Sequence, residues 1–200
     1  MKHQCVIAVS REFCSGGQDI AKKLAEELGI PYYDKEIITL AAKESGLSEK
    51  AIQESAKRHT GSLLYSLYSM SKDLPLTDQV YLIQSKVVRE LAQKGSCVIV
   101  GRCADYVLRD MPNCLRVFIH APLEDRIDQL RLYEVDEREE VLQNILAKED
   151  KARASYYHCY TQNRWGDAKN FHISLDASMG EDVCVEILKQ AVKGFEEKED

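Results

Sequence analysis

The chain has 200 residues, a length that fits one domain, or one domain with an insertion. Hydrophobic residues make up 44% of it and charged residues 30%, as in ordinary soluble globular proteins. The formal net charge of -6 gives no bulk attraction for DNA or RNA, but it leaves room for a local basic pocket that binds a small phosphate ligand.

No apolar run approaches the roughly 20 residues that a membrane-spanning helix needs, and the first residues lack the apolar stretch of a signal peptide. We therefore expect a cytoplasmic protein with no membrane and no nucleic-acid polymer as partner. The seven cysteines are scattered and include no Cys-x-x-Cys pair, which disfavours a disulfide scaffold and a zinc site. Most of them are expected to be small buried apolar residues. The oligomeric state stays open.

The first part of the chain has the pattern of a strand, a turn, a helix and a second strand. Residues 5–9 form a continuous apolar run, which is typical of a strand buried on both faces. After a glycine-containing turn, apolar residues recur at helical spacing over 20–28, and Gly29 ends that helix. Residues 30–33 indicate a second short strand. This order predicts the start of a parallel α/β sheet.

The rest of the chain predicts a helical insertion followed by three more strands. Helical patterns with breaks at glycine and proline fill residues 34–95. Further along, apolar runs predict strands over 96–100, 115–120 and 172–175, and helices are expected within 123–157 and 183–195. Five short strands with helical connections predict an α/β fold.

The turn between the first strand and the first helix, residues 10–19, is the most informative segment. In an open α/β sheet, ligands bind beyond the carboxyl ends of the strands. The start of a helix offers free backbone N–H groups and partial positive charge there, and Gly16 and Gly17 let the backbone approach an anion closely. The segment does not match the pattern G-x-x-x-x-G-K-[ST]. It indicates either a phosphate-binding loop or a tight turn that needs Ser15-Gly16-Gly17.

Several segments of the chain share motifs with one enzyme family. They are IAVSREFCSGGQDIAKKLAEELGIPYYDKEI (7–37), GRCAD (101–105), VFIHAPLEDR (117–126), DKARASYY (150–157) and WGDA (165–168). Together they resemble the cytidylate kinase-like family of the P-loop nucleoside monophosphate kinases. The resemblance covers nearly the whole chain and is weak over 45–95.

The resemblance implies a three-layer α/β fold of the P-loop NTPase type with a parallel five-stranded sheet. Residues 1–33 and 96–200 would form the core domain, 34–95 a helical acceptor-binding insertion, and 125–170 a helical lid. It also implies ATP and Mg²⁺ as cofactors and a nucleotide or another small molecule as substrate.

The loop departs from the orthodox members of the family at three positions. Gly17 stands where those members have the phosphate-binding lysine. Gln18 and Asp19 stand where they have Gly-Thr, so the hydroxyl that helps to hold Mg²⁺ is missing as well. Asp19 is either a first-turn helix carboxylate or a weak candidate ligand of the metal. Arg11 could supply positive charge to the phosphates, or it could pair with Glu12.

The residues expected to hold the ATP phosphates all lie between the end of the first strand and the first helical turn. They are Ser10, Arg11, Cys14, Ser15, Gly16, Gly17, Gln18 and Asp19. Cys14 is either a reactive thiol near a helix start or a small residue in a glycine-like position.

Three residues that follow other strands are candidates for binding the acceptor. Arg102 comes directly after Gly101 at a strand end, and the resemblance implies that it contacts the acceptor phosphate; a surface ion pair is the alternative. Asp105 could bind the acceptor or cap the helix that follows. Asp34 could accept a hydrogen bond from a ribose or a base, or cap its own helix.

Arg153 matches a lid position of the family, where arginines clamp developing charge and exclude water when the lid closes. The alternative is an ordinary charged helix face. Tyr156, Tyr157 and Tyr160 lie at helical spacing and are expected to pack rather than to stack on a base.

The sequence therefore predicts a phosphotransferase that moves the γ-phosphate of ATP to a small acceptor, with CMP as the first guess and Arg11, Arg102 and Arg153 as catalytic residues. The missing lysine supports a second hypothesis, a nucleotide-binding regulatory protein with little or no turnover. The weak match of the insertion supports a third, a kinase for a non-nucleotide metabolite.

Overall fold

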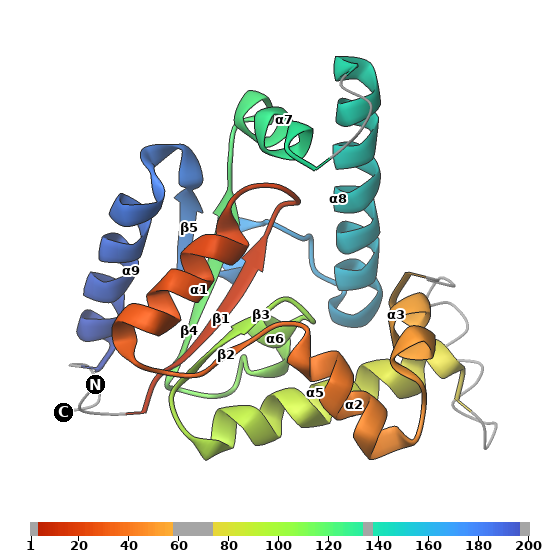
Figure 1. Cartoon of the computed structure of the whole chain (residues 1–200). Coiled ribbons are helices and arrows are strands. Elements are labelled where there is room, and N and C mark those ends of the chain that lie inside the picture. Colours follow the sequence, from red (N-terminus) through yellow and green to blue (C-terminus); the bar gives the residue numbers. More distant parts are fainter. Residues whose placement is uncertain (1–3, 58–73, 134–137, 197–200) are drawn as a thin grey trace.

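Figure 1 shows the computed structural model of the chain, which describes residues 4–57, 74–133 and 138–196. A parallel five-stranded sheet in the order β2-β3-β1-β4-β5 lies between two layers of helices. The strands are β1 (Val6–Arg11), β2 (Tyr32–Tyr33), β3 (Cys97–Val100), β4 (Cys114–His120) and β5 (Ile173–Asp176). The predicted three-layer α/β fold is confirmed.

The helices follow the predicted pattern, including a helical segment between β2 and β3. They are α1 (Gly17–Leu28), α2 (Glu36–Ser45), α3 (Glu49–Lys57), α5 (Leu76–Lys94), α6 (Ala104–Val107), α7 (Leu123–Arg131), α8 (Glu139–Thr161) and α9 (Glu181–Glu196). Residues 58–73 of the predicted insertion lie outside the described residues. In the part of the chain that the structure describes, no helix is both long and apolar enough to cross a membrane.

Neighbouring side chains of β1 alternate between two separate cores. Ile7 and Val9 pack with apolar residues of α1 and α9, whereas Val6 and Ala8 pack with those of α2, α5 and α6. Figure 1 shows these two groups of helices on opposite faces of the sheet. Because both faces of β1 are covered, its sequence is a continuous apolar run rather than an alternating one. The buried strand ends directly in the loop that begins α1.

The helices α7 and α8 form a smaller third core close to that loop. Ile127 and Leu130 of α7 pack with Leu142 and Leu146 of α8, and Phe13 of the loop rests against this cluster. In Figure 1, α8 stands as a long helix beside the carboxyl ends of β1 and β3. Within the predicted lid segment, residues 125–131 and 139–161 are therefore helical, and these helices contact the loop that follows β1.

Candidate active site

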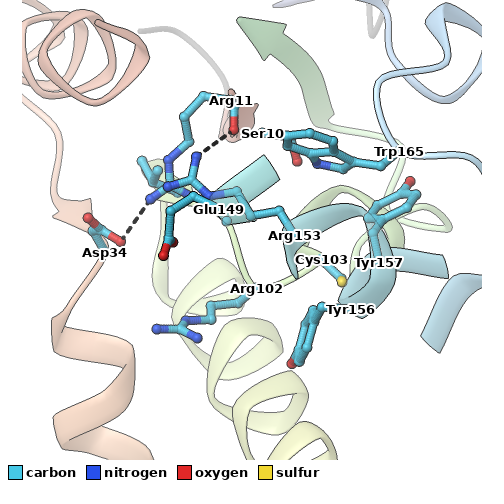
Figure 2. Close-up of a pocket in the computed structure, with 12 residues that line it drawn as sticks. Ser10, Arg11, Asp34, Arg102, Cys103, Glu149, Arg153, Tyr156, Tyr157 and Trp165 are labelled. Carbon is cyan, nitrogen blue, oxygen red and sulfur yellow. Dashed lines mark hydrogen bonds and ion pairs between the residues drawn. The ribbon is translucent and has the colours of Figure 1, made fainter. Parts of the chain in front are cut away.

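Two pockets open at the carboxyl ends of the strands, and they have two arginines in common. The arginine pocket, of about 250 Å³, contains these predicted residues: Ser10, Arg11, Asp34, Arg102 and Arg153 (Figure 2). The loop pocket, of about 520 Å³, contains these: Arg11, Cys14, Ser15, Gly16, Gly17, Gln18, Asp19 and Arg153. Arg11 and Arg153 line both pockets and so mark the place where the two meet.

Arg102 projects from a strained turn at the end of β3. Gly101, Arg102 and Cys103 have φ angles of 74°, 57° and 53°, so three successive residues are in the left-handed region. For residues with a Cβ this conformation costs of the order of 1–3 kcal/mol each and tends to occur at functional sites. Among the described residues, none forms an ion pair or hydrogen bond with the Arg102 guanidinium. The turn thus holds a free positive charge at the wall of the arginine pocket.

The guanidinium of Arg11 lies between Asp34 and the backbone of Gly101. Its Nη2 is 3.6 Å from Asp34 Oδ1, and its Nη1 fills the space in which a Cβ on Gly101 would have to lie. The alternative of a pair with Glu12 is wrong, because Glu12 pairs with Arg126 instead. Burial lowers the pKa of Arg11 while Asp34 acts in the opposite direction. The Arg11 guanidinium, held by Asp34, lines the arginine pocket (Figure 2).

Arg153 of α8 reaches the backbone of β1. Its Nη1 donates to the carbonyl oxygen of Arg11 at 2.9 Å, and its guanidinium lies 5.2 Å from the ring centre of Phe13. Burial, followed by the positive charge of Arg11, lowers the pKa of Arg153 to about 10. Arg102 also lowers the pKa of Arg11. Arg11 thus repels both Arg102 and Arg153 in the arginine pocket, which favours an anionic ligand there.

The backbone N–H groups of the loop fall into two sets. The N–H group of Phe13 already has a partner, since it donates to Asp150 Oδ1 at 2.9 Å. In contrast, no described residue accepts a hydrogen bond from the N–H of Ser15, Gly16 or Gln18. Gly16 has a φ of +75° and directly precedes α1, so these groups lie at the positive end of the helix. This arrangement suits a phosphate group.

Gly17 has no space for a side chain. A Cβ added there would lie 2.8 Å from the Cβ of Arg11, closer than such atoms approach in proteins, and 3.0 Å from the Cβ of Ile119, a tight contact. The N–H of Gly17 donates to Ser15 Oγ at 3.3 Å, and the Ser15 hydroxyl lies 3.0 Å from the carbonyl oxygen of Glu12 and 3.5 Å from that of Ile119 in β4. The side chains of Arg11 and Ile119 therefore exclude the lysine of the orthodox loop sterically from position 17.

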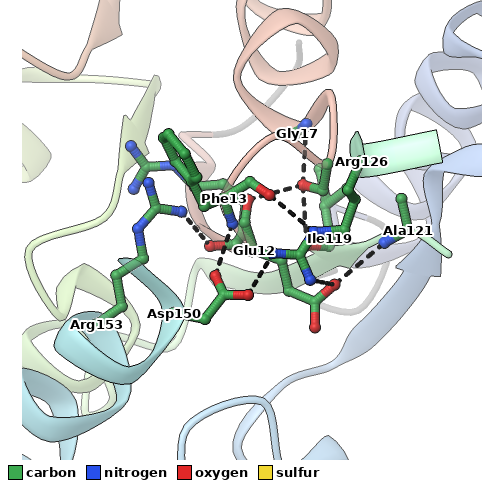
Figure 3. A network of polar contacts seen from close by, with 10 residues as sticks. Glu12, Phe13, Gly17, Ile119, Ala121, Arg126, Asp150 and Arg153 are labelled. Carbon is green, nitrogen blue, oxygen red and sulfur yellow. Dashed lines mark hydrogen bonds and ion pairs between the residues drawn. The ribbon is translucent and has the colours of Figure 1, made fainter. Parts of the chain in front are cut away.

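A single buried guanidinium ties the loop to α7 and α8 (Figure 3). Arg126 donates through Nε to the carbonyl oxygen of Phe13 at 2.8 Å, and its Nη1 is 3.2 Å from Glu12 Oε2. Its Nη2 binds Asp150, which in turn accepts the N–H of Phe13. The Arg126 side chain is only 8% exposed. Sequence reasoning missed this residue, because its partners lie far away along the chain.

The two helix-cap interpretations are wrong. The N-cap position of α6 is Cys103, and Asp105 lies inside the helix, where it is 2% exposed. Its carboxylate accepts from Ser10 Oγ at 3.2 Å and from the hydroxyl of Tyr157 at 2.7 Å, so it braces β1 against α8 without lining either pocket. The N-cap position of α2 is Lys35, which leaves the Asp34 carboxylate to Arg11.

The tyrosines of α8 pack as predicted, since Tyr156 contacts the rings of Tyr81 and Tyr160 and Tyr157 is 3% exposed, and two of them also reach the pocket wall. Tyr160 stacks on Tyr81 of α5 with ring centres 4.0 Å apart, which confirms its packing role. Tyr156 and Tyr157 both line the arginine pocket, together with Trp165 and Glu149 (Figure 2). Sequence reasoning did not select Glu149 or Trp165. The spacing of four residues from 149 to 153 and on to 157, one face of a helix, could have identified the first.

The carboxylate and backbone N–H groups of the loop pocket also suit a nucleoside triphosphate with Mg²⁺. Mg²⁺ keeps several waters and usually takes one or two protein carboxylates together with phosphate oxygens. Asp19 is exposed in the first turn of α1 and lines the loop pocket beside the free N–H groups. Asp19 would hold the ion there together with phosphate oxygens of the nucleotide.

Comparisons with known proteins place the chain in a family. A model of the cytidylate kinase-like family matches residues 6–179. The cytidylate kinase of Pyrococcus horikoshii is 28% identical over 160 residues, which cover 80% of this chain and 73% of that protein. The cytidylate kinase of Methanopyrus kandleri is 27% identical over 196 residues, with 93% of this chain and 92% of that protein covered.

Solved structures point to the same fold. An uncharacterized protein from Eubacterium ventriosum superposes with a TM-score of 0.74 at 29% identity, covering 96% of this chain and 99% of that one. The shikimate kinase of Bacteroides thetaiotaomicron has a TM-score of 0.57 at 12% identity, with 95% and 99% covered, a likeness of fold alone. The chain has the fold of the P-loop kinases, and it belongs to the cytidylate kinase-like family.

Proposed function

We propose that the protein transfers the γ-phosphate of ATP to a small anionic acceptor, with CMP as the first acceptor to test. The observation that carries the proposal is the pair of adjoining pockets that share Arg11 and Arg153. One pocket offers free backbone N–H groups to the donor phosphates, and the other offers the unpaired guanidinium of Arg102 to the acceptor. The names of the curated relatives support cytidylate as that acceptor.

Phosphoryl transfer depends on alignment of the reactants and on positive charge around the transferred group, more than on covalent help from the protein. The N–H groups of Ser15, Gly16 and Gln18 would bind the donor phosphates. Arg11 and Arg153, at the boundary of the pockets, would stabilise the charge on the equatorial oxygens in the transition state. Mg²⁺, held with the help of Asp19, would neutralise the phosphate oxygens.

The acceptor needs no general base if it is an ionised phosphate. A phosphate oxygen of the acceptor forms the new bond to the γ-phosphorus, and the bond from that phosphorus to the β,γ-bridging oxygen breaks, which leaves ADP. Arg102 would bind the acceptor phosphate in the bidentate manner that a planar guanidinium allows. Asp34 and Glu149 would accept hydrogen bonds from hydroxyl or amino groups of the acceptor, and Trp165 would cover its ring.

An assay of ADP release over a panel of nucleoside monophosphates and non-nucleotide metabolites tests the proposal. We expect turnover with CMP that falls by at least a hundredfold in Arg11→Ala and in Arg102→Ala. Lys22→Ala, which changes an exposed residue on α1, serves as the control with unchanged turnover. Activity with a non-nucleotide alone would reassign the acceptor. ATP binding without turnover on any acceptor would favour a regulatory protein, the alternative that the steric exclusion at Gly17 supports.

A further inference from the structure

The loop pocket contains a lysine from outside the loop. Lys35 precedes α2, yet it lines the same pocket as Gly16, Gly17 and Asp19. Its side chain is exposed, and within the described ranges no carboxylate or carbonyl lies in ion-pair or hydrogen-bond range of its ammonium group. A charged group at the wall of an anion-binding pocket that has no partner among the described residues is available to a ligand.

Local stability of α2 does not explain a lysine at this position. Lys35 is the N-cap residue of α2, and it makes no side-chain capping hydrogen bond. Ser, Thr, Asp and Asn are preferred at an N-cap, and a positive charge near a helix N-terminus is electrostatically unfavourable. A residue that breaks the local rule without a compensating contact is expected at a functional site.

The other two cations of the loop pocket, Arg11 and Arg153, each contact another part of the protein as well. Arg11 pairs with Asp34, and Arg153 donates to the carbonyl oxygen of Arg11. The backbone around Lys35 is held in place, since its carbonyl oxygen accepts from the N–H of Ile38 at 2.9 Å and its neighbour Asp34 is fixed by the ion pair. Whereas this backbone is fixed, the flexible four-carbon side chain of Lys35 can move its ammonium group toward the loop.

We propose that Lys35 supplies the ammonium group that position 17 cannot carry, by binding the β- and γ-phosphate oxygens of the nucleotide in the loop pocket. This rests on the proposed function, because it takes the loop pocket as the donor site. The positive charge then comes from the start of α2 rather than from the loop itself. Lys35 would thus be a catalytic residue of the transfer.

Calorimetric titration of the full chain with AMP, ADP and ATP tests this role. Lys35→Met should weaken ATP binding by about ten- to a hundredfold, the effect of losing one hydrogen bond between charged groups, and leave AMP binding nearly unchanged. Lys35→Arg should recover part of the affinity for ATP. Lys43→Met, at an exposed position farther along α2 and outside the loop pocket, is the matched control and should bind as the wild type does.

A purely structural role for Lys35 would shift the melting temperature and would not change the ratio of ATP affinity to AMP affinity. If the wild type binds ATP and Lys35→Met keeps that ratio, the inference is wrong while the proposed function stands. If the wild type binds none of the three nucleotides, the proposed function itself fails.

Discussion

Replacing Arg126 by methionine should destabilise the protein strongly, because the guanidinium of this residue joins three segments. It bonds the carbonyl of Phe13 and pairs with Glu12 and Asp150, while its own side chain is 8% exposed. Removal leaves two partly buried carboxylates facing each other without a cation. Breaking a buried ion pair costs about 3–5 kcal/mol, and the 26% and 20% exposure of the two partners favours the lower end, about 3 kcal/mol. For 200 residues this corresponds to a melting temperature lower by about 6–12 °C.

Differential scanning calorimetry measures this loss, and α7 itself provides the control. Arg131 lies on the same helix and pairs with Asp128 at 2.7 Å, but the two side chains are 41% and 72% exposed. Such surface pairs are worth about 0.2–1 kcal/mol, so Arg131→Met should change the melting temperature by only a few degrees at most. Equal shifts in the two variants would refute the view that Arg126 is the anchor of the loop. A double-mutant cycle with Asp150→Asn should also show a coupling energy of at least ~1 kcal/mol.

Further predictions concern the walls of the two pockets. Gly17→Lys should lose nucleotide binding by calorimetry, because its Cβ would lie 2.8 Å from that of Arg11 and 3.0 Å from that of Ile119; unchanged nucleotide binding in this variant would contradict the steric account. Gly101→Ala should lower kcat, since its Cβ would lie 2.5 Å from Arg11 Nη1 and displace the guanidinium; steady-state kinetics with an unchanged kcat would argue against a role for that position. Burial raises the pKa of Asp105 above its ordinary value of 3.8. Between the pKa of the unfolded chain and that of the folded state, the folded state holds a proton that the unfolded chain has released. The free energy of unfolding should therefore fall as the pH rises between these two pKa values. Urea titrations between about pH 3.5 and 7 should show that Asp105→Asn lacks this slope, and parallel curves for the two proteins would oppose the assignment.

Much of the architecture follows from local patterns in the sequence. The run at residues 5–9 predicted a doubly covered strand, and β1 is buried by α1 and α9 on one face and by α2, α5 and α6 on the other. Gly29 was predicted to end the first helix, and its φ of +64° lets its N–H close the last turn on Ala25 and Glu26. The topology also explains why candidates at separate strand ends, such as Arg11 and Arg102, line one pocket.

Contacts between distant segments were beyond the reach of the sequence. Asp105 looked like a helix cap because it is a short carboxylate near a helix start. Its actual partners, Ser10 and Tyr157, are 95 and 52 residues away. Likewise, the acidic face around Asp150 gave no sign that one of its carboxylates accepts the N–H of Phe13. Such convergence depends on how β1, α6 and α8 pack, and no periodicity encodes it.

The shared wall between the pockets has a thermodynamic consequence for the order of events. Arg11 and Arg153 border both pockets, so an anion that enters either one neutralises part of the field that attracts the second. Linkage makes this effect reciprocal. We therefore expect that donor and acceptor weaken each other's binding in the ground state. The same effect should weaken the binding of the two anionic products and speed their release.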